Sequence, residues 1–198
     1  SGVVPAFERG DYDRLGEILH RNWELKRRLA SGISDSSLDE MYELARAHVP
    51  TALARLCEQL TPERFESLKQ EIVPLLLAAT SKAAKEKNEV VQSAIYALGL
   101  FGDNDGDELD SAIRRTLIGA PNAHFDEQSK YYSRIALAYA GSRMGKGREP
   151  GAGIDEVRDH FAAQIGKSKQ GNLRSWTVLG AGLFARRPIS EPRASGRR

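Results

Sequence analysis

The stretch ALGLFG at residues 97–102 decides the fold, because variants of it return twice along the chain. The variants read ALAYAG at residues 136–141 and GAGLFA at residues 180–185, so the copies begin 39 and 44 residues apart. Helix endings of small and apolar residues that recur about every 40 to 47 residues are typical of two-helix repeats. A single unit of this kind cannot bury its own apolar face and stacks on its neighbours. We therefore expect a chain of stacked helix pairs.

A second phrase lies between the copies of the first and keeps the same spacing. It reads LDSAIRR and then IDEVRD, which places Ile113 and Val157 44 residues apart. Each is followed one helical turn later by a further apolar residue, Leu117 in the first copy and Phe161 in the second. This spacing puts an apolar stripe on one face of a helix. The repeating unit is therefore predicted to be helix, turn, helix.

Capping and helix-breaking residues set the expected elements. Thr61 followed by Pro62 indicates an N-cap with proline at the first helical position, and Pro74 is expected to kink the helix that follows. Further helices are expected at about residues 88–101, 107–118 (ended by GAPN at 119–122), 126–140, 154–165 and 172–186. The loop between the last two repeats, residues 141–153, holds five glycines and one proline and is expected to be the most flexible part. The predicted fold class is all-α: an α-solenoid of stacked helix pairs with an N-terminal helical pair.

The repeated region resembles the HEAT repeat family, in particular the divergent bacterial HEAT-like arrays. The resemblance is carried by IVPLLL at residues 72–77, VQSAIYALGLFGD at 91–103 and RSWTVLG at 174–180, and it covers roughly residues 62–187. The third copy departs from the family pattern, with Gly180 and Ala185 where alanine and glycine are expected, which is consistent with a modified end repeat. The resemblance implies a HEAT-like α-solenoid that binds other proteins.

The N-terminal part resembles a different family, the C-terminal domain of GHMP-type sugar kinases, especially heptose-phosphate kinases. The matching phrases are FERGDYDRLGEILH at residues 7–20, NWELKRRLASGIS at 22–34 and LDEMYELA at 38–45. The family pattern continues with a glycine-rich strand and turn, whereas this chain continues with HVPTAL at residues 48–53. The resemblance therefore implies either a helical pair that caps the repeats or a fragment of a sugar kinase lacking its ATP-binding loops.

Without the resemblance, the same residues predict two amphipathic helices. Asp11 is a suitable N-cap for the first, and Ser37 with Glu40 forms a capping box for the second. The predicted organisation is an N-terminal helical segment at residues 1–60, HEAT-like repeats at 61–187 and a disordered basic tail at 188–198.

Composition narrows the classes of partner. The chain has 198 residues, of which 40% are hydrophobic and 28% charged, and 29 basic residues against 27 acidic ones leave a net charge of +2. This balance gives no strong signal for nucleic acid. No apolar run is long enough to cross a bilayer, and the single cysteine, Cys57, excludes an internal disulfide.

Two short motifs suggest sites of chemistry. DNDGD at residues 103–107 is similar to a calcium loop, but Glu108 and Arg114 stand where that loop requires glycine and a bidentate glutamate. We favour an acidic turn in which Asp107 caps the next helix. The glycines of residues 145–153 are consistent either with an anion site at the next helix start or with a loop insertion. The sequence predicts no catalytic, cofactor-binding or metal-ligating residue.

The resulting functional prediction is a non-enzymatic protein-interaction scaffold. Arg114, Arg115 and Arg158 fall outside the apolar stripes of their helices and are expected to be exposed side by side along the repeats. They would bind another protein with an acidic surface, unless they form an ordinary solvated face. The alternative function is the sugar-kinase fragment.

Overall fold

The computed structural model describes residues 21, 36–123, 126–167 and 171–186. The chain divides into two units, Ser1–Ala45 and Arg46–Arg198, and the account below concerns the second. The expected helix capped by Asp11 and the expected basic tail at 188–198 lie outside the described residues.

The regular secondary structure of the described residues is helical and contains no strand, which confirms the prediction of an all-α fold. The helices are α3 (Ser36–Cys57), α4 (Pro62–Ala79), α5 (Asn88–Phe101), α6 (Glu108–Ala123), α7 (Glu127–Ser142), α8 (Ile154–Lys167) and α9 (Gly171–Ala185), with a 3-10 turn at Lys82–Ala84. None of these helices is long and apolar enough to cross a membrane.

Side-chain caps fix where the helices begin. The Thr61 hydroxyl accepts a hydrogen bond from the backbone N–H of Arg64, with Pro62 in the first turn, as predicted. Asp107 accepts from the N–H of Asp110 at 2.8 Å, which confirms its predicted capping role. Both caps satisfy N–H groups that have no partner inside the helix.

One helix end was predicted wrongly. Helix α6 was expected to end near residue 118, but it continues through Pro121 to Ala123. Leu117 and Ala120 are buried in the core, so packing holds the backbone helical beyond Gly119. Pro121 lies in the last turn, where its missing N–H removes only one hydrogen bond of the helix.

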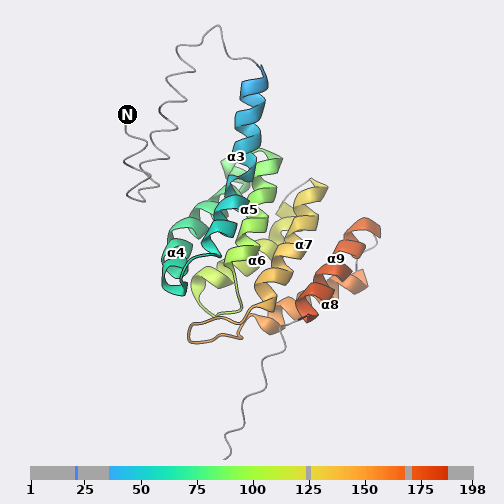
Figure 1. The fold of residues 1–198 in the computed structure, drawn as a ribbon. Coiled ribbons are helices and arrows are strands. Elements are labelled where there is room, and N and C mark those ends of the chain that lie inside the picture. Colours follow the sequence, from blue (N-terminus) through green and yellow to red (C-terminus); the bar gives the residue numbers. More distant parts are fainter. Residues whose placement is uncertain (1–20, 22–35, 124–125, 168–170, 187–198) are drawn as a thin grey trace, which may run out of the picture. The chain divides into compact units, whose positions relative to one another are not determined.

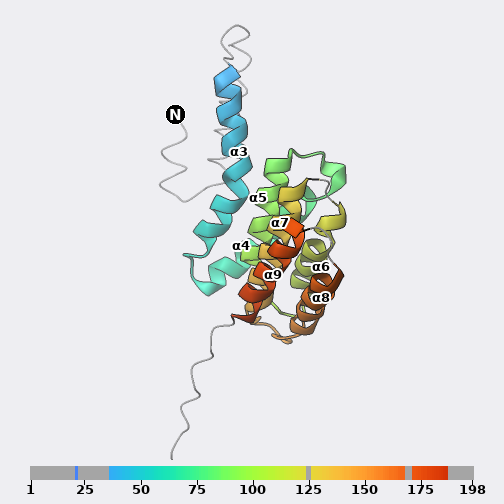
Figure 2. The same cartoon turned by 90° about the vertical axis from the view of Figure 1, so that its right-hand side faces the viewer.

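The helices of the second unit lie in two rows. In the first row α7 packs between α5 and α9, and residues 46–57 of α3 pack on α5 through hydrogen bonds from Thr51 to Ser93. In the second row α4 contacts both α5 and α6, while α6 packs on α7 and α8 packs on both α7 and α9. Figure 1 shows α5, α7 and α9 following one another, and Figure 2 shows α6 and α8 together on one side of them.

Small residues of the repeated phrase allow the helices of the first row to approach closely. A Cβ atom added to Gly99 of α5 would lie 2.4 Å from the Cα of Ala136 in α7. A Cβ atom added to Gly180 of α9 would lie 2.9 Å from the backbone oxygen of Arg134 in α7. Both distances are shorter than the contacts that Cβ atoms make in proteins. The repeated phrase therefore marks the places where the backbones of neighbouring helices come closest.

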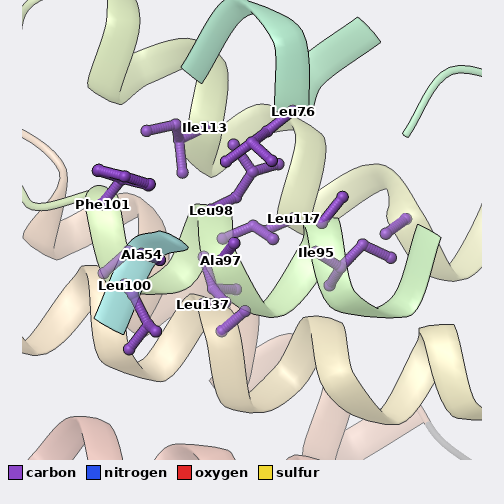
Figure 3. Close-up of a cluster of buried hydrophobic side chains, with 14 of the residues drawn as sticks. Ala54, Leu76, Ile95, Ala97, Leu98, Leu100, Phe101, Ile113, Leu117 and Leu137 are labelled. Carbon is purple, nitrogen blue, oxygen red and sulfur yellow. The ribbon is translucent and has the colours of Figure 1, made fainter. Parts of the chain in front are cut away.

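The core is built from the large apolar residues beside these crossings (Figure 3). Leu98 and Leu137 occupy the same position of the repeated phrase and are both fully buried. Ala181, at the third copy of this position, is half-buried and packs against the same core. The difference follows from the place of α9, which has a neighbouring row helix on one side only among the described residues.

Replacing Leu98 by alanine tests the packing of the first row. We expect Leu98→Ala to lower the free energy of unfolding by about 2–5 kcal/mol, because a fully buried leucine leaves a cavity when truncated. Leu75→Ala is the control, since Leu75 is 70% exposed on α4 and should cost less than about 0.5 kcal/mol. Urea unfolding followed by circular dichroism measures both, and equal small effects would show that Leu98 is not in the core.

Candidate functional site

Two loops at one end of the helices are joined by backbone hydrogen bonds, and we call them the fastened loops. The turn between α5 and α6, residues 102–107, and the loop between α7 and α8, residues 143–153, exchange backbone hydrogen bonds. The N–H of Asn104 donates to the oxygen of Arg143, and the N–H of Gly153 donates to the oxygen of Asn104, both at 3.1 Å. The glycine-rich loop, expected to be the most flexible part, is therefore tied along its length to the preceding turn.

The loop of residues 143–153 packs closely around the side chain of Asp105 in the preceding turn. The N–H of Gly147 donates to Oδ2 of Asp105. A Cβ atom on Gly145 would lie 2.6 Å from the Cβ of Asp105, so a side chain at this position would displace the carboxylate. The glycines are thus explained by the close approach of Asp105, and this contact is at Gly145 and Gly147 rather than at the start of α8, where the sequence suggested an anion site.

The acidic turn uses its carboxylates internally. Oδ1 of Asp103 accepts from the N–H of Asp105 at 2.8 Å, and Asp107 caps α6. Within the described ranges, no three acidic, histidine or cysteine side chains gather into a possible metal site. The arrangement supports the turn interpretation of residues 103–107.

A buried ion pair lies behind this turn and was missed in the sequence. Nζ of Lys69 in α4 lies 2.7 Å from Oδ2 of Asp110 in α6 and 3.7 Å from Oδ2 of Asp103. The Lys69 and Asp110 side chains are 2% and 1% exposed. Oδ1 of Asp110 also accepts from the N–H of Asp103 at 2.9 Å. One pair of side chains therefore joins α4, α6 and the acidic turn.

The sequence carried a signal for this pair. Lys69 falls on the same helical face as Phe65, Ile72 and Val73, and a charge inside an apolar stripe requires a partner. The sequence alone does not indicate which of the acidic residues pairs with Lys69.

Burial controls the protonation of the pair. Desolvation raises the pKa of Asp110 to about 7, although the hydrogen bond from Lys69 opposes this shift. Burial also lowers the pKa of Lys69, but the hydrogen bond and charge of Asp110, with the charge of Asp103, outweigh it and raise the pKa. Lys69 therefore stays protonated, while burial makes the charged form of Asp110 less favourable than it is in water.

The three predicted partner-binding arginines are not brought together. The expectation that Arg114 is exposed is wrong: it is buried, and its Nη1 donates to the backbone oxygens of Asp103 and Asp105, both at 2.8 Å. Its Nε also lies 3.1 Å from Glu156 of α8. Because the acidic turn offers carbonyl oxygens beside α6, Arg114 turns inward and braces that turn.

The other two arginines are exposed, but they differ in their surroundings. Arg158 forms ion pairs with Asp155 at 2.8 Å and Asp159 at 3.0 Å, both on its own helix α8. Arg115 is exposed on α6. Because two carboxylates accompany Arg158, this part of α8 is acidic rather than basic.

A pocket of about 330 Å³ opens beside the fastened loops, between α4, the end of α5 and the loop after α7. It is lined by Glu58, Leu60, Pro62, Phe65, Glu66, Leu100, Phe101, Asp103, Arg143, Met144 and Lys146. The rings of Phe65 and Phe101 form part of its apolar wall, with centroids 5.5 Å apart. Leu60 and Met144 are exposed apolar side chains of the lining.

Arg143 gives the pocket a fixed wall. Its Nε donates to the oxygen of Gly102 at 3.1 Å, and its Nη2 donates to the oxygens of Gly99 and Gly102. These bonds place a cation on the free carbonyl groups at the end of α5, where it is favoured by the helix dipole. Burial lowers the pKa of Arg143, and the charges of Asp103, Glu58 and Asp110 oppose this shift.

The buried ion pair predicts a pH-dependent cost of substitution. Lys69→Met should lower the free energy of unfolding by about 3–5 kcal/mol at about pH 8, because Asp110 is left buried without its cation. The folded-state pKa of Asp110 should then rise further above its unfolded value, so the native state binds more protons and the loss should shrink towards about pH 5. Urea unfolding at both pH values measures the difference between variant and wild type.

The control is Lys69→Met with Asp110→Asn, which removes the titrating carboxyl but keeps an acceptor for the N–H of Asp103. The double variant should lose the additional pH dependence. An equal loss for Lys69→Met at both pH values would contradict the buried pair.

Comparison of the chain with protein-family models, with curated proteins and with solved structures finds no match.

Proposed function

We propose that this chain is a non-enzymatic protein-interaction scaffold built from HEAT-like helical repeats. The observation that carries the proposal is the shared register of α5, α7 and α9. The phrase at residues 97–102 contacts the phrase at 136–141, with Gly99 against Ala136. The phrase at 180–185 packs back on α7, with Gly180 against the oxygen of Arg134 and Phe184 beside Gly141.

This regular contact supports a repeat array rather than an irregular helical bundle. Repeat arrays present a continuous surface made by successive units, and most of them bind other macromolecules through it. In this chain, the fastened loops add a rigid feature to that surface. They hold Met144 and Lys146 at the edge of the pocket beside Phe65 and Phe101.

The pocket is the binding surface that the geometry favours. It combines an apolar wall, in which Leu100 and Phe101 are buried and Phe65 is half-buried, with a charged edge that includes Glu66 and Lys146. Binding energy in protein interfaces is concentrated where an anchor side chain enters such a pocket and polar groups surround it. We propose that an apolar side chain of a partner protein occupies this pocket.

A partner with an acidic surface remains a second proposal, now resting on Arg115 and Arg158. Arg115 is exposed, and no described residue forms an ion pair or hydrogen bond with its side chain. An acidic partner would compete with Asp155 and Asp159 for Arg158. This competition makes the arginine surface the weaker of the two candidates.

Selection from a peptide library displayed on phage tests the pocket. Peptides enriched on the wild-type protein are expected to share an apolar residue and to bind Met144→Asp at least about tenfold more weakly, because the anchor loses an apolar wall. Leu75→Asp is the matched control, since Leu75 is an exposed apolar residue outside the pocket. Fluorescence polarisation with a labelled peptide measures the affinities.

Two outcomes would contradict the pocket proposal. Peptides that bind Met144→Asp normally but are lost on Arg115→Glu with Arg158→Glu would move the surface to α6 and α8. Saturable binding of ATP with magnesium in calorimetry would instead favour the sugar-kinase alternative, for which we expect no detectable heat.

A further inference from the structure

The outer face of α9 has the pattern of a helix–helix interface, and no described helix covers it. Gly182 occupies the same position of the repeated phrase as Gly99 and Ala138. A Cβ atom on Gly99 would collide with α7, whereas a Cβ atom on Gly182 would have no atom of the described residues within 4 Å. Val178 and Leu179, on the same face of α9, are 51% and 50% exposed.

The corresponding face is covered in the two preceding helices of the first row. In α5, Gly99 receives Ala136 of α7. In α7, Ile135 and Ala138 are buried, and Gly141 receives Phe184 of α9. The exposed face of α9 is therefore the one through which α5 and α7 each receive the next helix.

A second exposed apolar stripe lies on α3, which is hydrogen-bonded to α5. In residues 46–57 of α3, Thr51 and Ala54 face α5 and the core. Val49, Leu53 and Leu56 follow a helical spacing on another face and are exposed, Leu56 by 67%. On α5 the residues with the same spacing, Val90, Ala94 and Ala97, are all buried.

We propose that a second copy of this chain occupies the face of α9, seating its Val49–Leu53–Leu56 stripe against Val178, Leu179 and Gly182. The contact continues the row in the way that α7 follows α5, with Gly182 allowing the close approach that Gly99 allows. It is a head-to-tail contact between two different surfaces, which can extend to further copies. The proposal goes beyond partner binding at the pocket and does not require it.

Sedimentation velocity of the full chain from micromolar to millimolar concentration tests this contact. The wild type is expected to associate as its concentration rises, whereas Leu179→Arg and Leu56→Arg should each remain monomeric. An equal mixture of the two variants should form a dimer that grows no further, because each variant keeps one intact surface. Leu75→Arg, on an exposed apolar residue of α4, is the control and should associate like the wild type.

Three results would overturn the proposal. A wild type that is monomeric at every concentration would exclude it, and so would a mixture of the two variants that stays monomeric. Association of Leu56→Arg alone would show that α9 pairs with another α9 instead. Circular dichroism checks the fold of each variant, and Val49→Arg replaces Leu56→Arg if the latter unfolds. Loss of this contact would leave the binding of peptides at the pocket unchanged.

Discussion

Close approach between the backbones of neighbouring row helices is the constraint on which the other features depend. At Gly99 and Gly180 there is no room for a side chain, so the observed register of α5, α7 and α9 requires glycine at both positions. That register brings Leu98 and Leu137 into one core. It also sets the turn after α5 beside the loop after α7, where the backbone hydrogen bonds between them can form.

Buried charges stabilise the second row and its loops in a different way. Burying a charged side chain without a partner costs free energy. The buried charges here have partners in the acidic turn or on an adjacent helix, as is the case for Lys69, Asp110 and Arg114. These contacts depend on direction as well as burial, so they specify how α4 and α6 meet. The same contacts hold the turn at residues 102–107 in place, and this turn helps to shape the neighbouring pocket.

The sequence was informative where local physics decides the outcome. Periodicity and caps placed α5 within its observed bounds and identified Asp107 as a cap. Prediction failed where tertiary contacts decide: packing of Ala120 carries α6 past Gly119, and carbonyl oxygens of the acidic turn draw Arg114 inward. The pocket combines residues from α4, α5 and three connecting segments, and their meeting depends on packing that no short motif encodes.

The most direct test of the central claim compares two glycine substitutions by urea unfolding. In a helix with free space, glycine to alanine stabilises a protein by about 0.4–1 kcal/mol, and Gly119→Ala should do so because no neighbouring atom of the described residues lies within 4 Å of the new Cβ atom. Gly99→Ala should have the opposite sign and destabilise the protein by about 1–3 kcal/mol, since α7 must move away from α5. A stabilising effect of Gly99→Ala equal to that of Gly119→Ala would contradict the close approach of the two helices.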